Sequence, residues 1–177
     1  MSMRRFVVLP AYVVMFGLCY IAAVGVATAQ TQTVTSDKVE YTVELPSQTW
    51  RVVTQPDGVQ QHMEFVYGDR SDGFLRIRKE VVDQGATATD LARRDQEQKL
   101  RYAPGYVEGK QEKFVGRTNG VIASYEYTNA GKPMAGRIYY LQTDPRTIYT
   151  LHFTGARDKL ARIRSQTDFI ARSFQLK

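Results

Sequence analysis

The sequence predicts an α+β domain in which helices flank a central antiparallel sheet. Residues 147–154 alternate apolar and polar side chains, as a half-buried strand does. After Gly155, apolar residues recur every three or four positions, which places one apolar face on a helix over residues 157–174. That face is formed by Leu160, Ile163, Thr167, Ile170 and Phe174. Such a helix needs a sheet to cover, and the preceding chain divides into consecutive hairpins, which form antiparallel sheets.

The first thirty residues are expected to precede this domain. Arg4 and Arg5 come before an uncharged and largely apolar run over residues 6–26, and residues 27–29 offer a small-x-small cleavage site. The pattern predicts a signal peptide over residues 1–29, cleavage near Ala29 and a periplasmic or extracellular protein. The apolar run is also about long enough to span a bilayer, so its retention as an N-terminal anchor remains the alternative.

Removal of the leader changes the chemistry available to the chain. Cys19 is the only cysteine among the 177 residues, and it lies in the leader. A mature chain therefore has no disulfide, no cysteine nucleophile and no thiolate metal site. The formal charge falls from +6 to +4 when Arg4 and Arg5 are removed. This modest charge is spread along the chain, which argues against a nucleic-acid partner.

The mature chain is expected to form one domain over residues 39–177. Residues 30–38 are polar and lack periodicity, so they are predicted to be a flexible linker. Alternating or β-branched runs, separated by turn residues, predict the strands of the domain. These strands are expected at residues 39–45, 50–54, 61–67, 74–82, 106–117, 121–128, 134–142 and 147–154.

A first helix is predicted over residues 88–103. Thr87, followed three residues later by Asp90, resembles a capping box with Asp in place of Glu, and the residues that follow favour helix. Pro104 and Gly105 are expected to end it. Its apolar content is low, so we expect it to lie on the surface with one narrow contact stripe.

The order of these elements resembles that of the PsbP-like domains and their bacterial secreted relatives. An opening strand ends in Leu-Pro with a tryptophan shortly after it, and two helices interrupt the hairpins. The residues that carry the resemblance are Leu45, Pro46, Trp50 and the segments 137–141, 148–151 and 170–174. It covers residues 38–176 and implies an α/β/α sandwich. Members of this group are mostly accessory or binding proteins: PsbP assists the oxygen-evolving centre of photosystem II, and a eukaryotic relative binds Ran. No binding motif of either is matched, so no functional residue is transferred.

Two histidines are candidates for catalytic or metal-binding groups. His62 and His152 both fall in predicted strands, and neither belongs to a close pair such as His-x-His. A half-exposed strand position explains each of them, whereas a metal site or a hydrolase would need Glu64 or another carboxylate beside them. No serine lies in a Gly-x-Ser-x-Gly turn, and no phosphate-binding glycine loop follows a strand. No metal and no cofactor are therefore expected.

Aromatic side chains crowd three neighbouring predicted strands. They are Tyr125, Tyr127, Tyr139, Tyr140, Tyr149 and Phe153. Packing of the sheet under the closing helix explains them, since large rings bury much apolar area. The alternative is a cleft in which the tyrosine hydroxyls, with Arg137 and Arg146, recognise a ligand or a partner peptide.

The closing helix is rich in cations. It carries Arg157, Lys159, Arg162, Arg164 and Arg172 against Asp158 and Asp168. A solvated face explains this excess, and contact with an acidic partner or anionic lipid is the alternative.

Together these observations predict an exported, non-catalytic binding or accessory protein. Its partner would be another protein or an envelope component, bound by Arg162 and Arg164 or by the aromatic strand surface. Membrane contact is expected only through an uncleaved N-terminal segment. The rival function is a small-molecule carrier whose tyrosine-rich sheet face lines a pocket. A hydrolase built on His62 or His152 is the third hypothesis.

Overall fold

The computed structural model describes residues 31–57 and 62–177. The predicted leader, and the start of the strand expected at residues 61–67, lie outside these ranges. The main sheet has seven strands in the order β3-β4-β5-β9-β8-β7-β6, and all neighbours are antiparallel. Its strands are β3 (Trp50–Thr54), β4 (Met63–Tyr67), β5 (Gly73–Val81), β6 (Val107–Phe114), β7 (Gly120–Asn129), β8 (Lys132–Asp144) and β9 (Thr147–Ala156). The predicted α+β class is confirmed.

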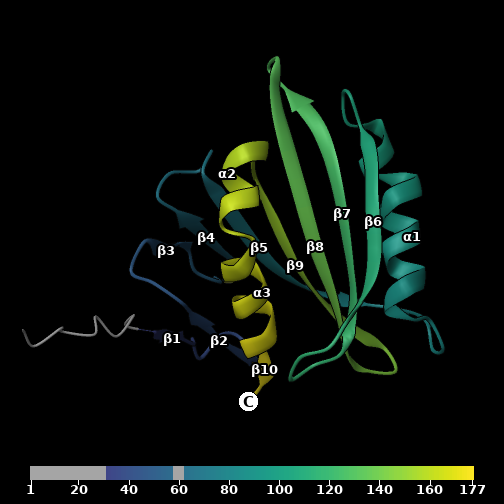
Figure 1. Ribbon diagram of the computed structural model, residues 1–177. Coiled ribbons are helices and arrows are strands. Elements are labelled where there is room, and N and C mark those ends of the chain that lie inside the picture. The colour runs from purple at the N-terminus through teal and green to yellow at the C-terminus, as the bar shows by residue number, and fades with distance from the viewer. Residues whose placement is uncertain (1–30, 58–61) are drawn as a thin grey trace, which may run out of the picture.

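Two helical layers flank this sheet (Figure 1). α2 (Arg157–Arg162) and α3 (Arg164–Ser173) cover one face, and α1 (Ala88–Gln98), followed by the 3₁₀ turn η1 (Leu100–Tyr102), packs against the other. Within the described ranges, no helix combines the length and hydrophobicity that a bilayer crossing requires.

A second, smaller sheet was not foreseen. It has the order β1-β2-β10 and consists of β1 (Gln32–Val34), β2 (Tyr41–Leu45) and β10 (Gln175–Leu176). The strand expected at residues 39–45 therefore exists but does not join the main sheet. Part of the segment predicted to be a flexible linker forms β1, because Val34 pairs with Val43 and is buried in the main core.

Both predicted helices are shorter than their sequence patterns suggested. The capping box at the start of α1 is present: the Thr87 hydroxyl accepts a hydrogen bond from the Asp90 amide, and the Asp90 carboxylate accepts one from the Thr87 amide. The helix ends at Gln98 because Lys99 leaves the helical region at φ −128°. The closing helix is divided into α2 and α3 at Ile163, whose ψ of 15° interrupts the helical backbone.

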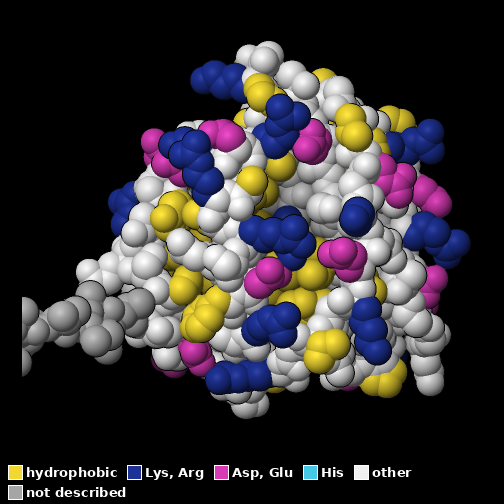
Figure 2. Space-filling model, in the orientation of Figure 1, with side chains coloured by type: hydrophobic (Ala, Val, Ile, Leu, Met, Phe, Trp, Pro, Cys, Tyr) yellow, Lys and Arg dark blue, Asp and Glu magenta, His cyan; other side chains and the backbone are white. Residues whose placement is uncertain are grey.

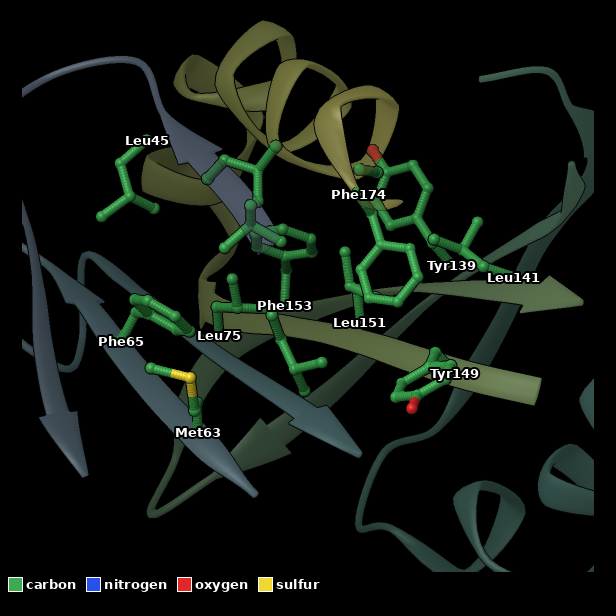
Figure 3. Packing of buried hydrophobic residues seen from close by; sticks show 14 of the residues in the cluster. Leu45, Met63, Phe65, Leu75, Tyr139, Leu141, Tyr149, Leu151, Phe153 and Phe174 are labelled. Carbon is green, nitrogen blue, oxygen red and sulfur yellow. The ribbon is translucent and has the colours of Figure 1, made fainter. Parts of the chain in front are cut away.

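The larger core lies between the main sheet and α3. Phe174 follows the last turn of α3 and is fully buried, and its ring centroid is 5.0 Å from that of Tyr149 and 5.3 Å from that of Tyr41. Figure 3 shows Phe174 above the sheet beside Leu151 and Tyr149. This core contains residues of both sheets and of α3. It therefore packs β1 and β2, near the start of the domain, against the end of the chain.

Strand alternation gives the main sheet two chemically different faces. In β8, Tyr139 and Leu141 point into the core beneath α3, whereas Ile138 and Tyr140 pack against α1. Helices α2 and α3 do not cover their face completely. On the α2–α3 face, β6 and most of β7 extend beyond the helices (Figure 1).

Candidate functional site

The uncovered part of the α2–α3 face holds a groove of about 450 Å³ between these helices and strands β6, β7 and β8. We call it the helix–sheet groove, and it is lined by Val107, Glu108, Gly109, Lys110, Glu112, Ile122, Ser124, Tyr125, Glu126, Ala135, Gly136, Arg137, Arg157, Leu160, Ala161 and Arg164. Figure 2 shows this face, where cationic and anionic side chains surround a hollow. Apolar side chains from both the sheet and α2 contribute to its walls.

Arg137 from β8 is the most buried charged side chain of this groove. The residue is only 9% exposed. Its Nε donates a hydrogen bond to the Tyr139 hydroxyl at 2.7 Å, and its Nη2 donates to Asp168 Oδ1 at 2.7 Å. Residues 137 and 139 lie two apart on one strand, so the β-pleat places both side chains on the same face. The guanidinium is therefore held in one orientation by β8 and α3 together.

The partners of Arg137 form a network of their own beneath α3. The Tyr139 hydroxyl donates to Asp168 Oδ1 at 2.6 Å and lies 3.0 Å from the Thr167 hydroxyl. Burial raises the pKa of Tyr139, and the hydrogen bond to the Asp168 carboxylate raises it further. Tyr139 thus stays protonated and keeps both the hydroxyl that accepts from Arg137 and the proton that it gives to Asp168.

Two ion pairs cross the rim of the groove. Arg157 of α2 lies 3.1 Å from Glu126 of β7, and Arg164 of α3 lies 3.9 Å from Glu112 of β6. All four side chains are about half exposed. Exposed pairs of this kind are weak, because water screens them and ordering two long side chains costs entropy.

The closing helices do not present an uncompensated basic face. Besides the two rim pairs, Arg162 lies 3.5 Å from Asp158, and Lys159 lies 3.3 Å from Asp72. Arg172 donates a hydrogen bond to the Val115 carbonyl. The excess of cations read from the sequence is balanced by carboxylates, several of which come from other elements.

Of the seven residues predicted as binding residues, the structure places the side chains of Arg137 and Arg164 at the groove, whereas Tyr125 borders it on β7 with its side chain on the α1 side of the sheet. Tyr139 lies directly beneath the groove and supports Arg137. Arg162 is an exposed residue of α2 outside the groove lining. The other two predicted residues, Tyr127 and Tyr149, lie elsewhere.

The tyrosines do not form one surface. Tyr125 and Tyr127 pack on the α1 side of the sheet, whereas Tyr139 and Tyr149 are in the core on the α3 side. The reason is the register, in which Tyr125 pairs with Gly136 and Ser124 with Arg137, so that β7 and β8 send residues of opposite parity to a given face. In the described part of the chain, these tyrosines therefore line no common pocket.

Tyr149 instead joins the sheet to the segment before β2. Its hydroxyl donates to Glu40 Oε2 at 3.1 Å. Burial, and then the hydrogen bond to Glu40, raise the pKa of Tyr149 to about 12. This contact is structural, because it ties the N-terminal part of the domain to β9.

The two histidines have separate partners. His62 lies 3.3 Å from Glu64, whereas His152 Nε2 lies 2.7 Å from the Tyr125 hydroxyl. In register, Arg76 of β5 stands between Glu64 of β4 and His152 of β9. Burial, and then the charge of Arg76, lower the pKa of His152 to about 4. Across residues 31–57 and 62–177, no three His, Cys, Asp or Glu side chains are grouped as metal ligands.

Sequence reasoning missed the groove itself and most of its walls. Glu112, Ser124 and Glu126 face it from β6 and β7, and Leu160 faces it from α2. Their alternation on the strands was visible in the sequence, but nothing in it showed that α2 and α3 stop short of β6. The pairing of Arg164 with Glu112, 52 positions apart, likewise had no sequence signal.

Comparison with known proteins gives fold neighbours only. No protein-family model and no curated protein sequence matches the chain. Among solved structures, LpqN of Mycobacterium tuberculosis, described as involved in cell envelope biogenesis, is 16% identical with a TM-score of 0.55, and the match covers 84% of this chain and 91% of LpqN.

Two further structures carry the names implied by the sequence resemblance. The cyanobacterial PsbP of Synechocystis, CyanoP, is 20% identical with a TM-score of 0.52, over 86% of this chain and 96% of CyanoP. The Ran-binding protein Mog1p of Saccharomyces cerevisiae is 8% identical with a TM-score of 0.57, over 84% of this chain and 96% of Mog1p. Identities this low establish shared architecture, and the chain accordingly has the Mog1/PsbP-like α+β fold.

Proposed function

We propose that this chain is an exported, non-catalytic binding protein that docks a segment of a protein partner in the helix–sheet groove. The observation that carries the proposal is Arg137, a guanidinium fixed by Tyr139 and Asp168 at the edge of an open hollow. A binding group already held in its bound orientation loses little conformational entropy when a ligand arrives. The groove therefore combines shape, apolar surface and an oriented charge.

Two fold neighbours support a binding role. Mog1p is named as a Ran-binding protein, and LpqN is described as involved in cell envelope biogenesis. The export part of the proposal rests on the charged start, apolar run and cleavage site of residues 1–29. Mass spectrometry of the chain recovered from cells that produce it at full length should give a mature form beginning at Gln30. A product that retains residues 1–29 would instead indicate an anchor.

The hydrogen bonds that the candidate catalytic side chains make within the domain support a non-catalytic function. The Nε2 atom of His152 is occupied by the Tyr125 hydroxyl, and Tyr125 is a poor proton donor to substrates because burial raises its pKa. Asp95 bonds Tyr140 and Lys99 instead of His152. The side chains that a hydrolase would use are thus committed to structural contacts.

Site-specific photocrosslinking tests the docking groove. A photoreactive residue replaces Ser124, which faces the groove, or, as a matched control, Thr154, which lies on the opposite face of the sheet. After irradiation of cells producing the full-length chain, we expect a protein adduct from position 124 that excess unmodified chain competes away, and none from position 154. Equal adducts from both positions, or an adduct from position 154 alone, would contradict the groove as the docking site.

A further inference from the structure

We infer that the helix–sheet groove binds an extended acidic peptide segment, in which a carboxylate accepts hydrogen bonds from Arg137 and an apolar neighbour packs on Ile122 and Leu160. This inference rests on the proposed docking function and names the class of its ligand. It follows from the donor inventory of Arg137, the burial of the charges around the groove, and the dimensions of the groove along β7.

Arg137 has donors left for a ligand. A guanidinium carries five N–H groups in a planar fork that matches a carboxylate. In the described part of the chain, two of its nitrogens have acceptors, with Nε bonded to Tyr139 and Nη2 to Asp168. The remaining N–H groups have no protein acceptor there. Because the side chain lines the groove, these donors are available to an incoming carboxylate.

The charged side chains of the groove differ in burial, and this difference determines which ligand charge the groove favours. The Arg137 side chain is 11% exposed, whereas the side chains of Glu112 and Glu126 are 49% and 47% exposed at the rim. A charge in a low-dielectric site acts on a ligand more strongly than one surrounded by water. Asp168, the carboxylate paired with Arg137, is 31% exposed and accepts from only one Nη nitrogen of the guanidinium, so the remaining donors of Arg137 favour a ligand anion.

The rim pairs allow further acidic residues to bind. Arg157 and Arg164 are held only by exposed ion pairs to Glu126 and Glu112, which water already weakens. A ligand carboxylate can replace either glutamate without burying an unpaired charge. The released glutamates return to solvent, where their desolvation penalty is small.

The geometry of the groove suits an extended segment. On β7 its lining runs from Ile122 to Glu126, four residue steps of about 3.3 Å, or roughly 13 Å. That length matches about four residues of extended chain. Ile122 of β7, Ala135 of β8 and Leu160 of α2 give this path apolar surface from three elements. Ser124 and Glu126 of β7 give it polar groups.

The first test selects ligands without assuming their sequence. A displayed library of random nonapeptides is selected on immobilised protein purified from cells that produce the full-length chain, and in parallel on the Ser124→Trp variant, whose indole fills the groove. We expect wild-type protein to enrich peptides that place Asp or Glu next to an apolar residue, and the variant to lose them.

The second test measures the charge dependence directly. Fluorescence anisotropy compares the best selected peptide with its amide counterpart, in which Asn or Gln replaces each acid. Arg137→Gln, or the amide peptide on wild-type protein, should weaken binding by about tenfold or more, and Arg164→Gln by about threefold. Arg162→Gln removes the same charge two positions earlier, at the end of α2 and outside the groove lining, so it should leave the dissociation constant unchanged.

Each outcome has a distinct meaning. Neutral peptides that bind wild-type protein and lose binding in Ser124→Trp would overturn the acidic ligand class while leaving the docking groove intact. Peptides whose binding survives Ser124→Trp would overturn the groove and the proposed function as well. If Arg137→Gln does not fold, the dissociation constants of the peptide for Arg164→Gln and Arg162→Gln are compared instead. Equal effects of these two surface variants would refute charge recognition in the groove.

Discussion

Acidification is expected to destabilise this fold through His152. The imidazole lies on the α1 face of the sheet, and its Nε2 is 2.7 Å from the Tyr125 hydroxyl. Burial is the largest cause of its low pKa, the charges of Arg76 and Arg78 add to it, and Asp95 opposes it. Protonation would place a third cation beside these two arginines, in a site where burial already disfavours the charged imidazole.

The pKa of His152 sets the size and the pH range of this effect. The imidazole titrates near 6.5 in the unfolded chain and near 4 in the folded one. The unfolded state therefore binds the proton first, so stability is complete above pH 6.5 and is lost as the pH falls towards 4. At about 1.4 kcal/mol per pKa unit, the loss is roughly 1.4 kcal/mol at pH 5.5 and about 2.5 kcal/mol at pH 4.5.

Urea unfolding of wild-type protein and of His152→Gln at pH 7.5, 5.5 and 4.5 measures this loss. Glutamine does not titrate and can still accept a hydrogen bond from Tyr125, and the carboxylates common to both proteins cancel in the difference. The free-energy difference between wild type and variant should shift by about 2.5 kcal/mol in favour of the variant between pH 7.5 and 4.5. A difference that does not change with pH would refute the buried neutral state of His152.

Three further predictions concern the framework that holds the groove. Phe174→Ala should lower the unfolding free energy by about 3–5 kcal/mol in urea denaturation, because the ring is fully buried. Phe169→Ala, at a position that is 38% exposed, should lower it by well under half as much in the same assay. Gly136→Ala should lower the unfolding free energy by about 2 kcal/mol, because the added Cβ would clash with the Tyr125 ring. Calorimetry should show that most of this loss disappears when Tyr125 is also replaced by alanine. Thr87→Ala should cost about 1 kcal/mol by removing the α1 cap, and Thr87→Ser should restore it; equal melting temperatures for the two would contradict the capping role.

Local patterns in the sequence predicted most elements of this domain correctly. Period-two alternation located the strands of the main sheet, the Thr87–Asp90 pair located the start of α1, and the apolar stripe from Leu160 to Phe174 identified the closing helical face. These features depend on residues a few positions apart, so they can be read along the chain. The element boundaries were less accurate, because backbone changes at Lys99 and Ile163 follow from packing that the pattern does not show.

The candidate site was only partly accessible to sequence reasoning. Arg137 and Tyr139 were singled out with the aromatic strands, and Arg164 with the cations of the closing helix. The alternative of one cleft lined by the tyrosines does not fit the structure, because the register between β7 and β8 places Tyr125 and Tyr127 on the opposite face of the sheet from Tyr139 and Tyr149.

The sequence by itself therefore determined the class of the fold, the positions of the main-sheet strands and of β2, and the apolar face of its closing helix, since each is a short-range property of the chain. The tertiary structure decided the insertion of β9 between β5 and β8, the separate sheet around β2, and the meeting of Arg137 with Asp168. These are contacts between residues that lie far apart along the chain. They depend on which of many compatible strand pairings and helix positions buries the apolar surface best, and no local pattern encodes that choice.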